Sequence, residues 1–460
     1  MKLPDKRLDR VLEKFSDRIR HRQTLSMRKL ANSRKEEIQF GRFLSNPRVN
    51  VQSFELVLYN QCGSSATDSQ HLLLLEDSTQ MAFSLQRQIE GLGKIDKGIV
   101  QGYYLHPVLT LDADNGACHG VSALEFRVRS QQGDGLTYLQ RKSVRSREFY
   151  EDKEAYRWQS SIEKALASLP PSSRKTVVAD RESDIYAVLV GLRQDLGVDY
   201  VIRSRIDRAL IEGDKLLNFM RQQPVRAEIE MEMPATEERS AHLARLQLRY
   251  AQVELNRTES RTKAPLPAHW KTWVVSVCEV AQTVPKGEQP VSWTLLTSHP
   301  VDSTEEAWRI VGFYKQRWNI EQIFRLLKSR CLRFESSQLS AYEKMQKLMV
   351  VALMGAVKVL QLVRAREGHT NQSLSAVFDE SEREFLGKLN VALEGSSDKQ
   401  KNPYPATSLA YGAWVIARLA GWSGYQSQRP AGPTDFFTGL QRFYEKWKGY
   451  RLFSQSCVYT

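Results

Sequence analysis

The sequence predicts an α/β fold, in which helices cover a central sheet. Three observations indicate this class. The apolar run 71–75 is followed directly by two acids, as at the end of a buried strand, and 175–180 repeats the pattern with β-branched residues before an aspartate. A helical pattern then occupies 185–194, and another strand pattern occupies 199–203. Strands that alternate with helices in this way are typical of an α/β layout.

The elements from residue 72 onward can be placed in order. We expect strands at 72–77, 102–112 and 118–129, a helix at 153–169, a strand at 175–180, a helix at 185–194 with Ser183 as its cap, and a strand at 199–203. Residues 205–300 contain alternating strands at 225–233 and 245–255. Beyond residue 345 the pattern is mostly helical, at 345–364, 408–419 and 436–450.

The first 65 residues predict helices crowded with basic side chains, interrupted by a turn signal at 44–49. The segment up to residue 50 carries a net charge of roughly +8, which favours contact with phosphates. The candidate DNA contacts are Arg18, Arg22, Arg28, Lys29 and Arg34, together with Arg203 at the end of a strand. A solvated charged surface is the alternative explanation.

Composition bounds the kind of protein. The 460 residues carry a net charge of +13, and 41% of them are apolar, so the chain can bury a large core and favours a polyanionic partner. The five cysteines are far apart and lack CxxC spacing, which supports neither a disulfide framework nor a zinc cluster. No signal peptide or membrane span is expected, because Lys358 interrupts the longest apolar run. Scattered, unpaired cysteines favour a reducing compartment such as the cytoplasm.

A polar stripe is predicted on the helical segment 314–328. Tyr314, Arg317, Glu321 and Lys328 are spaced so that all four lie within about 60° of one helical face. A carboxylate flanked by two cations and a phenol suits a metal site beside a phosphate. Ion pairs on a solvated helix would give the same pattern.

Two further acids decide between these interpretations. Asp77 and Asp180 each end a predicted buried strand, and the carboxyl ends of strands in α/β sheets are where ligands bind. Either acid alone would more simply serve as a cap or turn residue. Together with Glu321, however, they predict a site of three carboxylates for hard metal ions, with Asp184 and Glu76 as reserve ligands.

These motifs resemble those of a known enzyme family. Asp77 after its strand, the run Asp180 to Ile185, and the Tyr-x2-Arg-x3-Glu-x6-Lys spacing from Tyr314 to Lys328 are similar to the catalytic segments of DDE transposases of the insertion sequence 4 family. That family includes the transposase of the bacterial kanamycin-resistance transposon. The resemblance extends from Leu3 to about Gly439, and it is weaker at 205–271 and beyond 366.

The resemblance implies an architecture. It consists of a ribonuclease-H-like catalytic core interrupted by a β insertion, with helical N-terminal and C-terminal regions. The expected parts are a basic DNA-binding region at 1–65, the first part of the core at 66–204, the β insertion at 205–300, the second part of the core at 301–345, and a helical region at 346–460 that pairs two subunits.

The resemblance also implies a chemistry. Asp77, Asp180 and Glu321 would hold two Mg²⁺ ions about 3.5 to 4 Å apart, which Mn²⁺ can replace, with Asp77 as the bridging ligand. Tyr314, Arg317 and Lys328 would bind phosphates near the scissile bond. The expected partners are the double-stranded ends of the mobile element and the target DNA, held by a homodimer.

The expected reaction is hydrolysis at the element end, hairpin formation and opening, and strand transfer to target DNA. Trp293 would stack on the base flipped out to form the hairpin, although its alternating strand also allows simple burial. Two alternatives stay open. One is a nuclease or junction resolvase of the same fold, and the other is a non-enzymatic DNA-binding relative.

Overall fold

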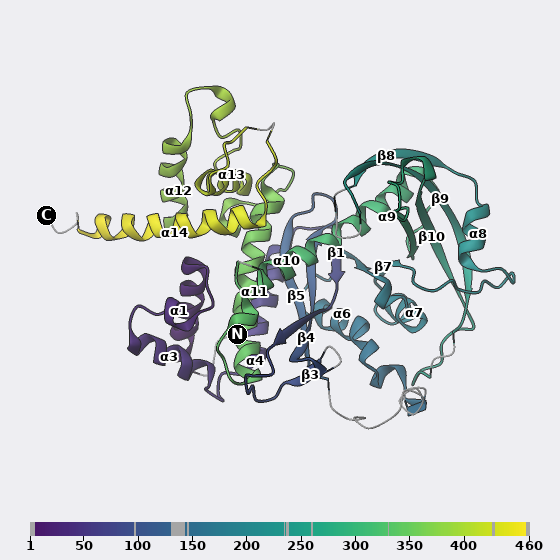
Figure 1. Ribbon diagram of the computed structural model, residues 1–460, viewed down its shortest axis with the longest axis horizontal. Coiled ribbons are helices and arrows are strands. Elements are labelled where there is room, and N and C mark those ends of the chain that lie inside the picture. The colour runs from purple at the N-terminus through teal and green to yellow at the C-terminus, as the bar shows by residue number, and fades with distance from the viewer. Residues whose placement is uncertain are drawn as a thin grey trace.

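The computed structural model is organised around one sheet of eleven strands (Figure 1). It describes residues 5–95, 98–129, 143–144, 147–233, 235, 239–258, 261–329, 331–425 and 428–456. The strands are β1 (His71–Glu76), β2 (Thr79–Phe83), β3 (Gly93–Ile95), β4 (Val100–Asp112), β5 (Cys118–Arg127), β6 (Arg174–Ala179), β7 (Asp199–Arg203), β8 (Ala227–Met233), β9 (His242–Asn256), β10 (His269–Glu279) and β11 (Ser292–Thr297).

Helices precede, cover and follow this sheet. They are α1 (Lys6–Arg22), α2 (Met27–Leu30), α3 (Arg34–Leu44), α4 (Val51–Ser65), α6 (Arg157–Leu166), α7 (Tyr186–Gln194), α8 (Leu216–Gln222), α9 (Thr304–Gln316), α10 (Trp318–Lys328), α11 (Tyr342–Ala365), α12 (Glu380–Leu393), α13 (Leu409–Ala420) and α14 (Pro433–Ser456). The mixed α/β class expected from the sequence is therefore confirmed.

The centre of the sheet is parallel. Strands β1, β6 and β7 run side by side in the same direction, with Glu76 of β1 opposite Ala179 of β6. Alternation along β1 sends Leu72 and Leu74 into one apolar core and Leu73 and Leu75 into the other. A strand buried on both faces must be apolar throughout, which explains why this run was recognisable in the sequence.

Antiparallel strands flank this centre on both sides. On one side β4 pairs with β1 and also with β2, β3 and β5. The short β2 and β3 were not foreseen, because three to five residues carry too little periodicity to be distinguished from loop. On the other side β11 pairs with β7, and β10, β9 and β8 follow outward. The strands expected between residues 205 and 300 thus extend the same sheet (Figure 1).

The helices cover both faces of the core strands. Helices α6 and α7 belong to one apolar cluster, and α4 and α11 pack against β5 on the other face. Helix α11 is long and apolar enough to cross a membrane by length and composition alone, but 78% of its most apolar window is buried inside the protein. Because α11 begins at Tyr342, the domain boundary expected at residue 345 falls within it.

Two local expectations were wrong. Ser183 does not cap α7: its hydroxyl donates to the Asp180 carbonyl within a short 3-10 turn, and α7 begins after Ile185 without a side-chain cap. The segment 314–328 is not one uninterrupted helix either. It is divided at Arg317, where the Arg317 amide bonds to the carbonyl three residues before it and the carbonyl accepts from the amide three residues after it.

Candidate active site

Asp77 and Asp180 follow the ends of adjacent parallel strands. The last registered pair of β1 and β6 is Glu76 with Ala179, so the next residue on each strand is one of these aspartates. Both acids therefore leave the sheet at the same edge, as expected for a ligand site of an α/β fold. The Asp77 carboxylate accepts from the amide of Ser78 at 2.8 Å, which fixes its direction.

The break between α9 and α10 places Arg317 at the centre of the site. Its Nη1 donates to Asp77 Oδ2 at 3.0 Å and its Nη2 donates to Glu321 Oε1 at 2.6 Å. Tyr314, one helical turn earlier, donates its hydroxyl to Asp180 Oδ1 at 3.1 Å. The helical segment thus reaches both strand ends, and all three expected carboxylates are joined through two residues of the predicted stripe.

The electrostatics of the site reflect a concentration of negative charge. Burial raises the pKa of Asp77 to about 6, against the opposing effect of Arg317, and the nearby Glu321 and Asp180 carboxylates raise it further. Burial alone lowers the pKa of the Arg317 guanidinium, but the surrounding anionic groups raise it above its usual range. Burial, followed by the Asp180 charge, raises the pKa of Tyr314.

The donor chemistry suits a hard divalent cation, although the acids are not arranged as a ready cage. Within the described ranges, no group of three His, Cys, Asp or Glu side chains is close enough to hold a metal ion. Instead, the Arg317 guanidinium lies between Asp77 and Glu321 and neutralises them. Three carboxylates around one fixed cation offer the oxygen ligands that Mg²⁺ prefers, and Asp77 is already destabilised as an anion. These residues therefore fit metal ions, which would neutralise the carboxylates in place of Arg317.

The other residues expected at the site lie at different distances from it. Trp293 on β11 is half-buried, and its ring centroid is 5.8 Å from that of Tyr314, so it borders the carboxylates without being a full core residue. Arg203 at the end of β7 donates to the Ser292 carbonyl at 3.0 Å, next to Trp293. Lys328 ends α10, three turns from Arg317, and burial lowers its pKa.

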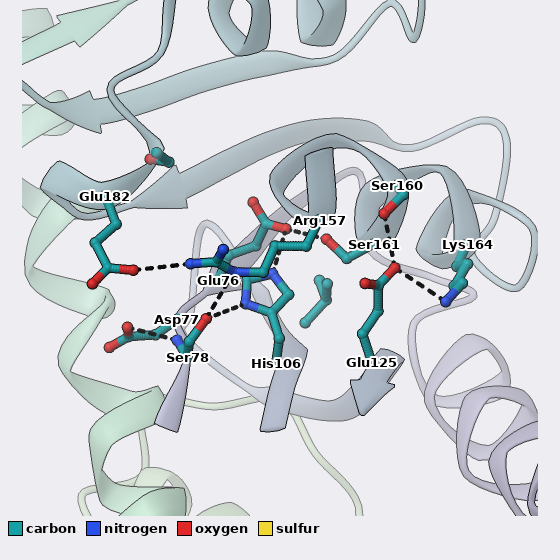
Figure 2. A network of polar contacts seen from close by, with 12 residues as sticks. Glu76, Asp77, Ser78, His106, Glu125, Arg157, Ser160, Ser161, Lys164 and Glu182 are labelled. Carbon is teal, nitrogen blue, oxygen red and sulfur yellow. Dashed lines mark hydrogen bonds and ion pairs between the residues drawn. The ribbon is translucent and has the colours of Figure 1, made fainter. Parts of the chain in front are cut away.

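A buried polar network behind Asp77 was missed in the sequence (Figure 2). Glu76, fully buried, accepts hydrogen bonds from Ser161 and lies 3.4 Å from His106 Nε2. The other ring nitrogen of His106 is 2.9 Å from the Ser78 hydroxyl, and Arg157 Nε donates to that hydroxyl at 3.1 Å. This network therefore holds the two residues on either side of Asp77.

The His106 ring in this network is uncharged. Burial lowers the pKa of His106 to about 3, so its ring is neutral, and burial raises the pKa of Glu76 well above the usual range. No described residue forms a hydrogen bond with Glu76 Oε2. The rings of His106 and Trp158 are in edge contact, with centroids 4.7 Å apart, as suits a structural histidine. Only spatial proximity, not sequence spacing, links these residues.

Asp184, a reserve metal ligand, is occupied by a structural ion pair. Its Oδ1 accepts from Arg208 Nε at 3.0 Å and from Nη2, and its Oδ2 accepts from the amides of Arg205 at 2.7 Å and Ile206 at 3.1 Å. Asp184 and Arg208 are each 2% exposed. Both carboxylate oxygens are therefore committed to holding the chain that follows β7.

The basic side chains of the N-terminal region fall into two groups. Arg28, Lys29 and Arg34 are exposed. Arg18 instead pairs with the buried Glu36 at 3.3 Å, and Arg22 donates to backbone carbonyls of the α2 segment. The second group thus contributes to the packing of the helices as well as to surface charge.

Glu36 anchors this helical region. Besides Arg18, it accepts from Lys14 at 2.7 Å and from the Asn32 amide. Although burial raises the pKa of Glu36, the Lys14 hydrogen bond and the other donors outweigh it and lower the pKa to about 2. The helical N-terminal region therefore contains a buried, ionised carboxylate that needs its cations.

The segment that contains α6 to the middle of α11 has a recognisable relative. Residues 160–357 match the family model described as the transposase DDE domain. This match supports a DDE transposase. It includes Asp180, Tyr314, Arg317 and Glu321, whereas Asp77 lies before the matched segment. DDE transposase domains act on DNA and generally use divalent metal ions, which agrees with the donor chemistry of the site.

Proposed function

We propose that this protein is a cut-and-paste DNA transposase of the insertion sequence 4 family. The observation that carries the proposal is the meeting of Asp77 and Asp180, from neighbouring strand ends, with Glu321 through Arg317 and Tyr314. These acids come from three separate segments, and Asp77 and Arg317 are 240 residues apart. A cap or surface ion pair needs no such convergence.

Asp77, Asp180 and Glu321 would hold two Mg²⁺ ions, with Asp77 shared between them. Metal ions bound there would activate the attacking oxygen and stabilise the leaving oxygen of a phosphodiester. In a loaded site, Arg317 would compete with the metal ions for Asp77 Oδ2 and Glu321 Oε1, the oxygens that it contacts, and would be displaced from at least one of them. A released guanidinium can then bind a DNA phosphate in a planar, two-point contact.

Tyr314 and Lys328 complete this proposed phosphate site. Tyr314 already presents a hydroxyl to Asp180, and a phosphate oxygen can accept the same proton once that carboxylate is engaged elsewhere. Lys328 supplies a partly buried point charge at the other end of α10. Both residues would orient the backbone on either side of the scissile bond.

Trp293 supports a hairpin step. It stands beside Tyr314 with part of its ring exposed, a position from which it could stack on a base extruded near the cut. Extruding a base costs a few kcal/mol, and stacking on an aromatic ring offsets about 1 to 3 kcal/mol of that cost. The homodimer, the element ends as duplex partners, and the bacterial cytoplasm belong to the same proposal.

The decisive experiment mixes the purified protein, Mg²⁺ and DNA carrying the flanking ends of its element. The expected result is cleavage at the element end by the wild type and none by Asp77→Ala, Asp180→Ala or Glu321→Ala, with end binding retained, since affinity comes from phosphate contacts elsewhere. Cleavage by any of these variants would remove that residue from the metal site. Binding without cleavage by the wild type would favour a non-enzymatic relative.

The product distinguishes a transposase from a nuclease or resolvase. Joining of element 3′ ends to a second DNA, detected by sequencing across the new junctions, is expected of a transposase only. Cleavage of branched DNA without any joined product would favour the resolvase.

A further inference from the structure

Helices α1 and α14, from opposite ends of the chain, form the two walls of a groove. The groove has a volume of about 770 Å³. Figure 1 shows α14 projecting from the helical C-terminal region, with α1 next to it. Neither wall belongs to the sheet that carries the acids.

Aromatic contacts fix the floor of this groove. The ring centroid of His21 on α1 lies 4.6 Å from that of Tyr444 and 5.2 Å from that of Trp447, both on α14. The guanidinium carbon of Arg20 lies 5.9 Å from the centroid of the Tyr444 ring. Its Nη2 lies 3.5 Å from Oε1 of the buried Glu382 on α12. The walls are therefore held at a defined separation.

The lining of the groove is basic on both walls. Helix α1 contributes Arg10, Lys14, Arg18 and Arg22, and α14 contributes Lys448 and Arg451. Against these six cations the lining has three acids, Glu13, Asp17 and Glu445, an excess of three positive charges. Outside the lining, Arg20 pairs with Asp17 at 3.0 Å and Glu36 pairs with Lys14 and Arg18, so one added cation and one added acid leave this excess unchanged.

The groove adjoins another one that reaches the segment after α10. A second groove of about 840 Å³ shares Arg22 and Gln441 with the first. It is lined by Arg28 and Lys29 and by the segment after α10, which includes Arg333. The two adjoining grooves form a basic path from the α1 and α14 pair to the segment that follows α10, the helix that carries Glu321.

The segment after α10 has two features of a binding surface. Arg333 has a left-handed backbone with φ of 50°, a conformation that costs a non-glycine residue energy and recurs at ligand sites. Ser337 is 7% exposed, and its hydroxyl has no hydrogen-bond partner within the part of the chain that the structure describes. Both lie where the path meets the core.

We propose that α14 binds DNA together with α1, and that this path holds the phosphate backbone of the duplex that leads away from the cleavage site. The proposal rests on the proposed function and extends it, because the C-terminal helical region then contacts DNA in addition to pairing subunits. Charge complementarity selects the partner: an excess of arginine and lysine along the two adjoining grooves suits a regularly spaced polyanion.

The test compares two lysines on α14. Lys448 lines the groove, whereas Lys446 is also exposed on the same helix but is not part of the lining. Binding of a fluorescent duplex carrying the element end is measured by anisotropy between about 50 and 200 mM salt, where phosphate contacts are most visible. Lys448→Glu is expected to weaken binding about tenfold and to lower the salt slope by about one, while Lys446→Glu changes affinity less than about twofold.

A variant on the other wall makes the result independent of α14 folding. Arg10→Glu, on exposed α1, is expected to weaken binding by a similar factor. Melting temperature and light scattering confirm that each variant keeps its fold and oligomeric state. Equal effects of Lys446→Glu and Lys448→Glu, or no effect of Lys448→Glu, would overturn the proposal while wild-type binding remains. Failure of the wild type to bind the duplex would instead overturn the proposed function.

Discussion

Replacing Asp184 by asparagine tests whether this acid is structural or catalytic. Among the described residues, Oδ1 of Asp184 accepts from Arg208 alone, and Oδ2 accepts from two backbone amides and the Ser204 hydroxyl. In either orientation, an asparagine amide group would therefore point a donor at other donors. The substitution also leaves the buried Arg208 guanidinium without its counter-ion.

The expected cost follows from this geometry. Breaking a buried ion pair by removing one partner costs about 3 to 5 kcal/mol. With an unfolding entropy of about 2.1 cal/mol/K per residue over 460 residues, each kcal/mol of lost unfolding free energy lowers the melting temperature by about 1 °C. Asp184→Asn should therefore melt about 3 to 5 °C below the wild type. Asp180→Asn, at the nearby strand end, should shift the melting temperature by about 1 °C or less.

Scanning calorimetry at one fixed scan rate measures these shifts, because a chain of this size can unfold irreversibly. The double variant Asp184→Asn with Arg208→Met should recover part of the loss, since neither charge is then buried alone. An Asp184→Asn protein that melts with the wild type but no longer cleaves DNA would refute this reasoning and return Asp184 to the metal site.

Three further outcomes are expected. In Gly439→Ala the new Cβ would lie 2.1 Å from the Ile416 carbonyl oxygen, so α13 and α14 must separate and the melting temperature should fall by about 2 °C or more. In Gly449→Ala the new Cβ would meet no described atom within 4 Å, so the melting temperature should rise by up to about 1 °C. Glu36→Gln should lower the free energy of unfolding by at most about 3 kcal/mol at pH 7. Because folding lowers the pKa of Glu36, this difference from the wild type should vanish as pH falls from about 4.5 to about 2. Trp293→Ala should permit the first nick but slow hairpin formation, and an abasic site at the flipped position should partly restore the rate.

Each of these outcomes has a measurement that can contradict it. Calorimetry that finds Gly439→Ala as stable as Gly449→Ala would show that α13 and α14 tolerate a wider spacing. Thermal unfolding of wild type and Glu36→Gln with a constant difference down to pH 2 would mean that the carboxylate is not ionised in the fold. Denaturing gels that show normal hairpin rates for a folded Trp293→Ala would make Trp293 a packing residue.

The ends of β1 and β6 could be predicted because burial constrains the amino-acid composition of a strand. Strands covered on both faces must be apolar throughout, so the acids that end β1 and β6 stand out in the sequence. Their adjacency follows from parallel pairing, which the alternation of strands and helices indicated. For the same reason Asp77 and Asp180 were assigned to one site before their positions were known.

The details around those acids could not be predicted, because they depend on contacts between distant segments. Helical periodicity continues on both sides of Arg317, so nothing in the spacing marked the break that aims its guanidinium at Asp77. Asp184 appeared as a candidate ligand because the sequence does not reveal that Arg208 is its partner. The metal-binding role of the three acids, the phosphate-binding role of Tyr314, Arg317 and Lys328, and the stacking role of Trp293 stay predictions.

The position of Glu321 so late in the chain has a consequence for synthesis. During translation the basic helices emerge first, then β1 and β6 with their aspartates, and Glu321 emerges only after the strands up to β11. Domains form as the chain leaves the ribosome, at about 5 to 20 residues per second. A nascent chain therefore presents its basic N-terminal helices before it holds all three acids of the proposed active site. Arg317, which emerges with Glu321, then neutralises the acids at the moment they first come together.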